Sequence, residues 1–193
     1  MRNTATNAFK RHQELVERSL EVVAPDVEKA SKILLAAIKT NNCVFTCGNG
    51  GSAADSQHLS GEFLCRYKDD RRPLKAMALT VDTSAMTAIG NDYHFDLVFA
   101  RKIQALGNPH DVLVAFTTSG SSKNILAAVS QAKAQGLHTI VFTGEGGAHL
   151  RGVADAVIAV PSRETARIQE VHQIIYHALC EHIDAALPTI HAA

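Results

Sequence analysis

The sequence predicts an α/β fold in which helices cover both faces of a parallel sheet. Short apolar runs, mostly rich in β-branched residues, alternate along the chain with longer segments whose apolar residues recur at helical spacing. Short apolar strands of this kind are typical of parallel sheets that are buried on both faces. Polar and glycine-rich loops follow the runs, as expected where such sheets bind ligands. We therefore expect a doubly wound sheet, with residues 1–193 forming a single domain.

Two helices are expected before the first strand. Residues from about 8 to 23 and from about 26 to 40 carry apolar side chains at helical spacing. A βα unit does not need these helices. We therefore expect residues 1–40 to pack on the sheet or to mediate oligomerisation.

Five strands and the helices that connect them account for the rest of the chain. The expected strands are Cys43–Cys47, Lys75–Leu79, Asp111–Thr117, Thr139–Thr143 and Ala156–Val160. The expected helices are Ser52–Tyr67, Thr83–Asn91, Phe95–Leu106, Ser122–Gln135, Ala148–Val153 and Arg163–Leu187. The tail, Pro188–Ala193, is expected to fray. Ligands of open parallel sheets bind beyond the carboxyl ends of the strands, so the loops after these strands are the candidate site.

Composition excludes several classes of function. The 193 residues include 19 basic and 19 acidic side chains, so no basic field attracts nucleic acid or an anionic membrane. No apolar run approaches the ~20 residues of a membrane span, and residues 1–12 lack the apolar stretch of a signal peptide. The four cysteines form no Cys-x-x-Cys pair and three lie in apolar surroundings, so buried reduced thiols are expected. A cytoplasmic enzyme or binding protein is expected.

A glycine loop follows the first expected strand. Asn49, Gly50 and Gly51 precede Ser52, which can cap the next helix. A plain turn with a helix cap is the simpler interpretation, but two consecutive glycines and an asparagine exceed what a cap needs. The pattern therefore favours a binding loop.

A hydroxyl-rich loop follows the third expected strand. It runs from Thr117 to Ser122 and contains five hydroxyl groups around Gly120. Hydroxyls and free amides at a helix start bind phosphate, whereas a helix cap alone needs one hydroxyl. The loop lacks the Gly-Lys-Ser/Thr element of a P-loop and the glycine pattern of dinucleotide-binding proteins. We expect it to be the main phosphate site, with Thr117, Thr118, Ser119 and Ser122 as candidate contacts.

His58 and Glu62 lie four residues apart on the helix after the glycine loop. This spacing places them on one face, about 6 Å apart along the axis. They could share a metal ion, act as an acid–base pair, or simply form a surface contact. Asp55, one turn earlier, could orient the imidazole of His58.

Two further groups have both a functional and a structural interpretation. His177, on the last helix, is either a functional group or a core histidine. Asn91 and Asp92, at the end of another helix, either bind sugar hydroxyls or form a turn.

Together these motifs resemble those of the phosphoheptose isomerases, a family with the sugar isomerase (SIS) fold, over nearly the whole chain. The matching motifs are Cys47–Ser52, His58 with Glu62, Gly90–Asp92, Thr118–Gly120, and Arg167–Glu170 with His177. The family usually has Ser-Thr-Ser-Gly where this chain has Thr117-Thr118-Ser119-Gly120, which retains the hydroxyl.

The resemblance implies a five-stranded flavodoxin-like sheet, a homotetramer with active sites at subunit interfaces, and one Zn²⁺ per subunit. It implies that D-sedoheptulose 7-phosphate is isomerised to D-glycero-D-manno-heptose 7-phosphate, the first step toward bacterial heptose. The implied metal ligands are His58, Glu62, Gln169 and His177. The implied phosphate contacts are Ser52, Thr118, Ser119 and Ser122. The implied sugar contacts are Asn49, Gly50, Gly51, Glu62, Asn91, Asp92 and Gln169.

Ketose–aldose exchange needs a base and an acid, for which Glu62 and His177 are the candidates. Gln169 and His177 are eight residues apart, about 12 Å along an ideal helix and about 80° around it. The last helix therefore begins late or bends, or two chains contribute to one site.

Two other functions fit the same fold. A non-catalytic SIS adaptor that binds the replication initiator has no need of both Glu62 and His177. A regulatory sugar-phosphate sensor needs the phosphate loops but not Glu62.

Overall fold

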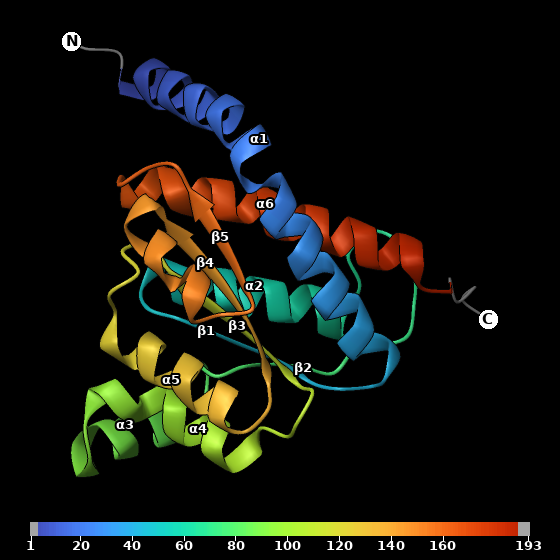
Figure 1. The fold of residues 1–193 in the computed structure, drawn as a ribbon, viewed down its shortest axis with the longest axis vertical. Coiled ribbons are helices and arrows are strands. Elements are labelled where there is room, and N and C mark those ends of the chain that lie inside the picture. Colours follow the sequence, from blue (N-terminus) through green and yellow to red (C-terminus); the bar gives the residue numbers. More distant parts are fainter. Residues whose placement is uncertain (1–3, 189–193) are drawn as a thin grey trace.

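Five parallel strands form the centre of the protein in a computed structural model that describes residues 4–188 (Figure 1). The sheet order is β2-β1-β3-β4-β5, which confirms the flavodoxin-like topology. The strands are β1 (Val44–Gly48), β2 (Ala76–Ala78), β3 (Val112–Thr117), β4 (His138–Gly144) and β5 (Ala156–Val160). Each lies within two residues of its expected position.

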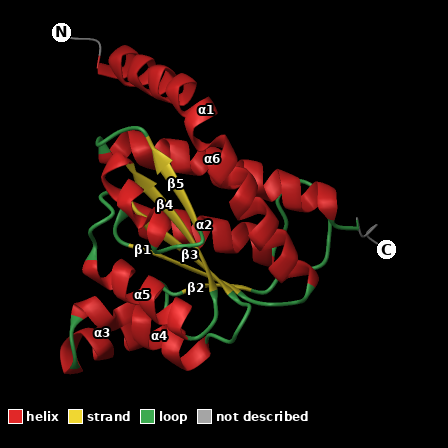
Figure 2. Ribbon diagram, in the orientation of Figure 1, coloured by secondary structure: helices red, strands yellow, loops and turns green. Residues whose placement is uncertain are grey.

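Helices cover both faces of this sheet (Figure 2). One face carries α1 (Thr4–Lys39), α2 (Gly51–Leu64) and α6 (Thr165–Ala186). The other carries α3 (Thr83–Asp92), α4 (Val98–Leu106) and α5 (Lys123–Ala134), with two 3₁₀ segments, η1 (Phe95–Leu97) and η2 (Glu145–Gly152). The segment expected to be a helix at 148–153 is thus part of a longer 3₁₀ segment.

Successive side chains along a strand point alternately to the two faces of the sheet, so each apolar run contributes to both cores. Along β3, Val112, Val114 and Phe116 join the core beneath α1, α2 and α6. Leu113 and Ala115 join the second core, beneath α4 and α5. Both sets are fully buried, which explains why the strand sequence is continuously apolar rather than alternating.

The N-terminal segment is one helix, so the expectation of two helices is wrong. Pro25 lies inside α1. A proline inside a helix costs about 3 kcal/mol, because it removes one hydrogen bond and clashes with the preceding turn. Leu15 and Val23 before it and Leu34 after it all pack in the same core, so burial outweighs the local cost.

The cysteines carry free thiols. Cys47 and Cys180 are buried and Cys43 is half-buried, whereas Cys65 is exposed because α2 ends at Leu64 and leaves it in a loop. Of the helices within residues 4–188, none combines the length and hydropathy that a membrane span requires.

His172 lies entirely inside the core, between α6 and the sheet. Its Nε2 is 3.1 Å from the carbonyl oxygen of Thr143, and its ring packs edge-on against Phe142 at 5.4 Å between centroids. Burial lowers the pKa of His172 to about 4, because the charged imidazolium would lose its hydration. The folded protein therefore holds this side chain neutral.

We expect the His172→Gln variant to lose less stability in acid than the wild type. Below the unfolded-state pKa of about 6.5, the unfolded chain gains a proton that the folded chain does not. The free energy of unfolding therefore falls as the pH drops from about 6.5 to about 4, by up to about 3 kcal/mol from this group. A glutamine keeps a donor for Thr143 but does not titrate. Urea unfolding at several pH values measures this difference, and equal pH slopes for both proteins would contradict it.

Candidate active site

Helices α2 and α6 lie side by side and run in the same direction, so their residues meet in sequence order. Near their starts, the Gln169 amide lies 3.3 Å from Ser52 Oγ. Further along, α6 brings His177 beside His58, with 5.0 Å between ring centroids. The alignment follows from the sheet: both helices leave the carboxyl edge of a parallel strand and return across the same face.

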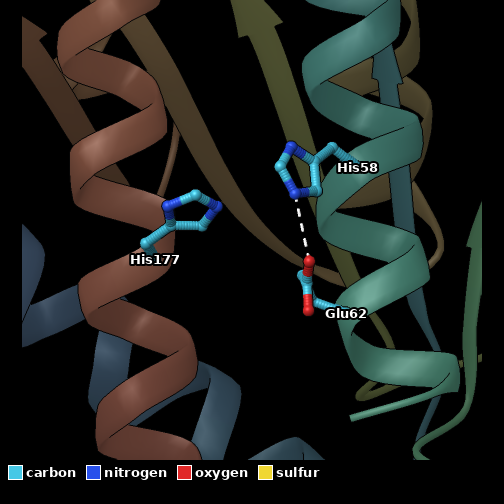
Figure 3. A group of neighbouring side chains, drawn as sticks. All are labelled: His58, Glu62 and His177. Carbon is cyan, nitrogen blue, oxygen red and sulfur yellow. Dashed lines mark hydrogen bonds and ion pairs between the residues drawn. The ribbon is translucent and has the colours of Figure 1, made fainter. Parts of the chain in front are cut away.

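Three side chains converge between these helices (Figure 3). His58 and Glu62 share a face of α2, as their spacing predicted, and His58 Nε2 lies 3.0 Å from Glu62 Oε1. His177 projects toward them from α6, and one ligand atom from each residue lies within 4.8 Å of the others. Within residues 4–188, Nε2 of His177 is buried without a hydrogen-bond partner. A buried polar atom without a partner is costly, so this nitrogen is available to a ligand.

Two tyrosines that the sequence analysis did not single out complete this cluster. Tyr176 is buried, and its hydroxyl lies 2.9 Å from Nδ1 of His58. Tyr67 lies against the ring of His177, with 5.3 Å between centroids and 32° between planes. Both contacts join segments distant in sequence, so no local pattern could have indicated them.

Tyr176, rather than Asp55, orients the imidazole of His58. In the described part of the chain, Asp55 Oδ2 is buried without a hydrogen-bond partner. Burial raises the pKa of Asp55 to about 6, although the nearby His58 lowers it in part. The expected contact between Asp55 and His58 is replaced by the tyrosine hydroxyl.

The donor set fits a zinc ion. Catalytic zinc sites use three protein ligands, histidine nitrogens and carboxylate oxygens among them, and leave a position open. His58, Glu62 and His177 supply two imidazoles and one carboxylate. Partial burial, together with the nearby His58, lowers the pKa of His177 and so favours the neutral ring that a metal requires.

Gln169, the fourth residue of the expected ligand set, lies at the glycine loop within a single chain. A Cβ added at Gly51 would lie 2.7 Å from the Gln169 amide nitrogen, so glycine makes room for this side chain. Helix α6 begins four residues before Gln169 and continues beyond His177 as one helix. Of the three alternatives, a late start is therefore ruled out, whereas a bend in the helix and a site shared by two chains stay predictions.

The hydroxyl-rich loop ends at the N-terminus of α5. Ser122 is the N-cap residue, yet within the described residues no side-chain hydrogen bond caps this helix. Thr117 is buried and donates to Ser122 Oγ at 3.3 Å, whereas Ser119 is exposed and Thr118 half-exposed. The uncapped amides and the helix dipole favour an anion here.

Gly120 lets this loop pack closely against η2. Its φ is +72°, and a Cβ at this position would lie 2.2 Å from Gly147 Cα. Only glycine fits such a conformation and approach.

A pair of amides joins the two loops. Asn49 Nδ2 donates to Asn124 Oδ1 at 2.9 Å, and Asn124 Nδ2 donates to Asn49 Oδ1 at the same distance. Asn124 is 3% exposed, and the sequence analysis did not identify it as a site residue. The Asn49 side chain thereby fixes the glycine loop to the start of α5, and its expected contact with sugar stays a prediction.

Asn91 and Asp92 lie apart from the cluster within one chain. Both are exposed at the end of α3, and Asn91 Nδ2 donates to Asp92 Oδ1 at 2.8 Å. Helix α3 packs on η1 and α4, on the opposite face of the sheet from α2 and α6. Nothing in the fold of one chain brings these two side chains to His177.

Comparison with known proteins gives one consistent result. The family profile described as SIS domain matches residues 9–144. The phosphoheptose isomerase of Aliarcobacter butzleri is 44% identical over 187 residues, covering 97% of this chain and 99% of the relative. That of Nitratiruptor sp. is 48% identical over 173 residues, covering 90% and 92%.

Solved structures agree with these relatives. Phosphoheptose isomerase from Neisseria gonorrhoeae is 38% identical with a TM-score of 0.88, over 94% of this chain and 97% of that one. The enzyme from Francisella tularensis is 35% identical with a TM-score of 0.90, over 95% and 97%. The sugar isomerase domain of an RpiR transcription factor from Sphaerobacter thermophilus has a TM-score of 0.68 at 16% identity, over 97% of this chain and 93% of that one, which shows a shared fold alone.

We expect a double-mutant cycle on Asn49 and Asn124 to give a coupling energy of about 1–2 kcal/mol in the free energy of unfolding. Each single alanine variant leaves a partly buried amide without its partner, whereas the double variant removes both. Urea unfolding measures the coupling. Gln131 and Gln135 form a matched control, since this local amide pair joins α5 to its own C-cap residue and should couple by about 0.2–0.5 kcal/mol. Additive effects at Asn49 and Asn124 would show that the two loops are not joined through these amides.

Proposed function

Since the chain belongs to the phosphoheptose isomerase family of SIS-domain proteins, we propose that it converts D-sedoheptulose 7-phosphate to D-glycero-D-manno-heptose 7-phosphate through an enediol, in bacterial heptose biosynthesis. The observation that carries this proposal is the convergence of His58, Glu62 and His177 at one end of a fold that also offers an anion site. Such an enzyme needs one group for the proton on carbon and another for the protons on oxygen.

A zinc ion, one per subunit, is proposed to bind His58, Glu62 and His177, with Gln169 as the fourth ligand. When bound, zinc polarises a carbonyl and stabilises negative charge on its oxygen. The fit of the three clustered donors supports this assignment, and the family resemblance supports the fourth.

Glu62 and His177 are proposed to move the protons. The Glu62 carboxylate takes a proton from C1 of the ketose, and the electron pair of that C–H bond forms the C1–C2 double bond. His177, which acts in this step in its protonated form and so not as a metal ligand, delivers a proton to the oxygen on C2, giving the enediol. Glu62 then returns its proton to C2, while His177 accepts the proton of the oxygen on C1, giving the aldose. Both residues end in their starting protonation states.

The substrate phosphate is proposed to bind at the start of α5, against Thr117, Thr118, Ser119 and Ser122, with Ser52 beside it. The glycine loop, Gln169, Asn91 and Asp92 are proposed to contact the sugar. An anchored phosphate converts binding energy into orientation of the reacting carbons near Glu62.

The cluster of His58, Glu62 and His177, which we call the triad, argues against the two non-catalytic alternatives. An adaptor for the replication initiator, or a sugar-phosphate sensor, has no use for a carboxylate and two imidazoles held together. The relatives that match nearly the whole chain are phosphoheptose isomerases.

The assembly is proposed to be a homotetramer in the cytoplasm, with active sites at subunit interfaces. The separation of Asn91, Asp92 and Gln169 from the triad within one chain supports a shared site. Unpaired thiols at all four cysteines fit a reducing compartment.

We expect the metal-loaded wild type to isomerise sedoheptulose 7-phosphate, and Glu62→Gln to lower kcat by about 100-fold or more, because the base for the carbon-bound proton is lost. Removing the metal with a chelator should lower turnover, and added Zn²⁺ should restore it. Glu28→Gln, which removes an exposed helical carboxylate paired with Lys32, should leave kcat unchanged. Aldose formation measured over time tests these outcomes. No turnover by the metal-loaded wild type would rule out the proposed activity.

Mixed assemblies test the shared site. Glu62→Gln and Asp92→Asn subunits should each be poorly active alone. If Glu62 and Asp92 of one site come from different chains, random mixing restores about a quarter of the sites. Subunits with two different tags can be co-expressed, purified as mixed assemblies and assayed. Activity no higher than that of the separate variants would place both residues of a site in one chain.

A further inference from the structure

We propose that Arg71 and Asp184 are positioning residues, which hold Glu62 and His177 at their working separation. The inference rests on the proposed function, because it assigns a role to residues outside the reacting groups. The two side chains form an ion pair beyond the triad, near the ends of α2 and α6. Arg71 Nε lies 2.7 Å from Asp184 Oδ1, and the side chains are 1% and 2% exposed.

The remaining guanidinium nitrogens bind the end of α2. Arg71 Nη2 donates to the carbonyl oxygen of Glu62 at 2.9 Å, and Nη1 donates to that of Phe63 at 3.1 Å. Helix α2 ends at Leu64, so these last-turn carbonyls lack helical N–H partners. Arg71 therefore fixes the backbone of the residue whose carboxylate is the candidate base.

Asp184 holds the loop that follows α2. Its Oδ2 accepts hydrogen bonds from the backbone amides of Lys68 at 2.9 Å and Asp69 at 3.2 Å. The residue before Lys68 is Tyr67, whose ring lies on His177. Asp184 thus fixes both Arg71 and the segment that covers His177.

Asp184 also shares a helix with His177. The two residues are seven positions apart on α6, about 10 Å along the axis and on nearly the same face. A single aspartate therefore links α6, the covering loop and, through Arg71, the last turn of α2. A shift of this end of α2 relative to α6 would change the distance between Glu62 and His177.

The ion pair contributes more to the positioning of the neighbouring backbone than to the folding stability of the protein. A buried ion pair adds little over well-packed apolar side chains, because desolvation offsets much of the attraction. A rigid guanidinium fork, however, fixes the direction of each of its bonds. Small misplacements of catalytic groups reduce rates strongly, so such fixed geometry matters for the reaction.

The decisive variant is Arg71→Lys. Lysine keeps the positive charge beside Asp184, but one ammonium group cannot reproduce the planar fork that also binds the carbonyls of Glu62 and Phe63. Arg72→Gln is the matched control. Arg72 is the neighbouring arginine, and its Nη2 donates at 2.9 Å to the carbonyl of Ile38 at the end of α1, away from the triad.

Two readouts separate positioning from simple stabilisation. The first is kcat and KM for sedoheptulose 7-phosphate. The second is tyrosine fluorescence during titration with Co²⁺, which needs no turnover. The chain has no tryptophan, and two of its three tyrosines, Tyr67 and Tyr176, contact the triad histidines.

For Arg71→Lys we expect kcat to fall at least about tenfold with KM within about twofold, and the Kd for Co²⁺ to rise at least about tenfold. Arg72→Gln should lower the unfolding midpoint but leave both readouts at wild-type values. A folded Arg71→Lys protein with wild-type kcat and Kd would overturn the proposal. An inactive wild type would instead refute the proposed function, and the Co²⁺ titration would still test the positioning role.

Tyr67→Ala tests the covering loop should Arg71→Lys fail to fold. Tyr67 is only half-buried at the margin of the core, so its removal disturbs packing less than the loss of a fully buried side chain would. We expect a lower kcat with little change in KM, because His177 loses the ring packed against it. Wild-type kcat and Co²⁺ affinity in this variant would refute the positioning role of the Asp184-bound loop.

Discussion

The parallel packing of α2 against α6 is the constraint on which the site depends. Both helices follow strands of one parallel sheet and lie on the same face, so both begin at the carboxyl edge and run away from it. Contacts therefore occur in matching order: Gln169 with Ser52, His177 with His58, and Asp184 with Arg71. The proposed anion site also lies at this carboxyl edge, at the start of α5, which no side-chain hydrogen bond caps among the described residues. The sheet thereby sets the separation between the proposed phosphate end and the proposed proton-transfer end of the site.

The Tyr176 hydroxyl can hydrogen-bond to Nδ1 of His58 whether that nitrogen accepts or donates. When His58 donates from Nε2 to Glu62, its Nδ1 is an acceptor, and the Tyr176 hydroxyl donates to it. When Nε2 is instead a metal ligand, Nδ1 carries the proton and the same hydroxyl accepts it. A carboxylate at this position could only accept from Nδ1 and would favour one state. Burial keeps the Tyr176 hydroxyl protonated by raising its pKa, so both roles remain open.

The sequence was informative wherever a contact is local. The five strands follow from apolar runs, and the shared face of His58 and Glu62 follows from their spacing of four residues. It was uninformative where the contact joins distant segments. Tyr176 on His58, Asn124 on Asn49 and Arg71 on Asp184 all depend on how separate segments pack, which the periodicity within one segment does not reveal. The prediction of two N-terminal helices was wrong for a related reason. Pro25 favours a helix break locally, but burial of the residues on both sides of it outweighs that preference.

The division of the expected site residues between the two faces of the sheet argues for a shared site. His58, Glu62 and His177 lie between α2 and α6, whereas Asn91 and Asp92 end a helix that buries none of its own residues. This helix packs mainly on its neighbours η1 and α4. Three apolar side chains that flank it in the sequence, Val81, Tyr93 and Phe95, are exposed. Burial of these side chains against another subunit would stabilise α3 and bring its polar end to a second site. Through the same apolar side chains, Asn91 and Asp92 would then become part of a site in the assembly.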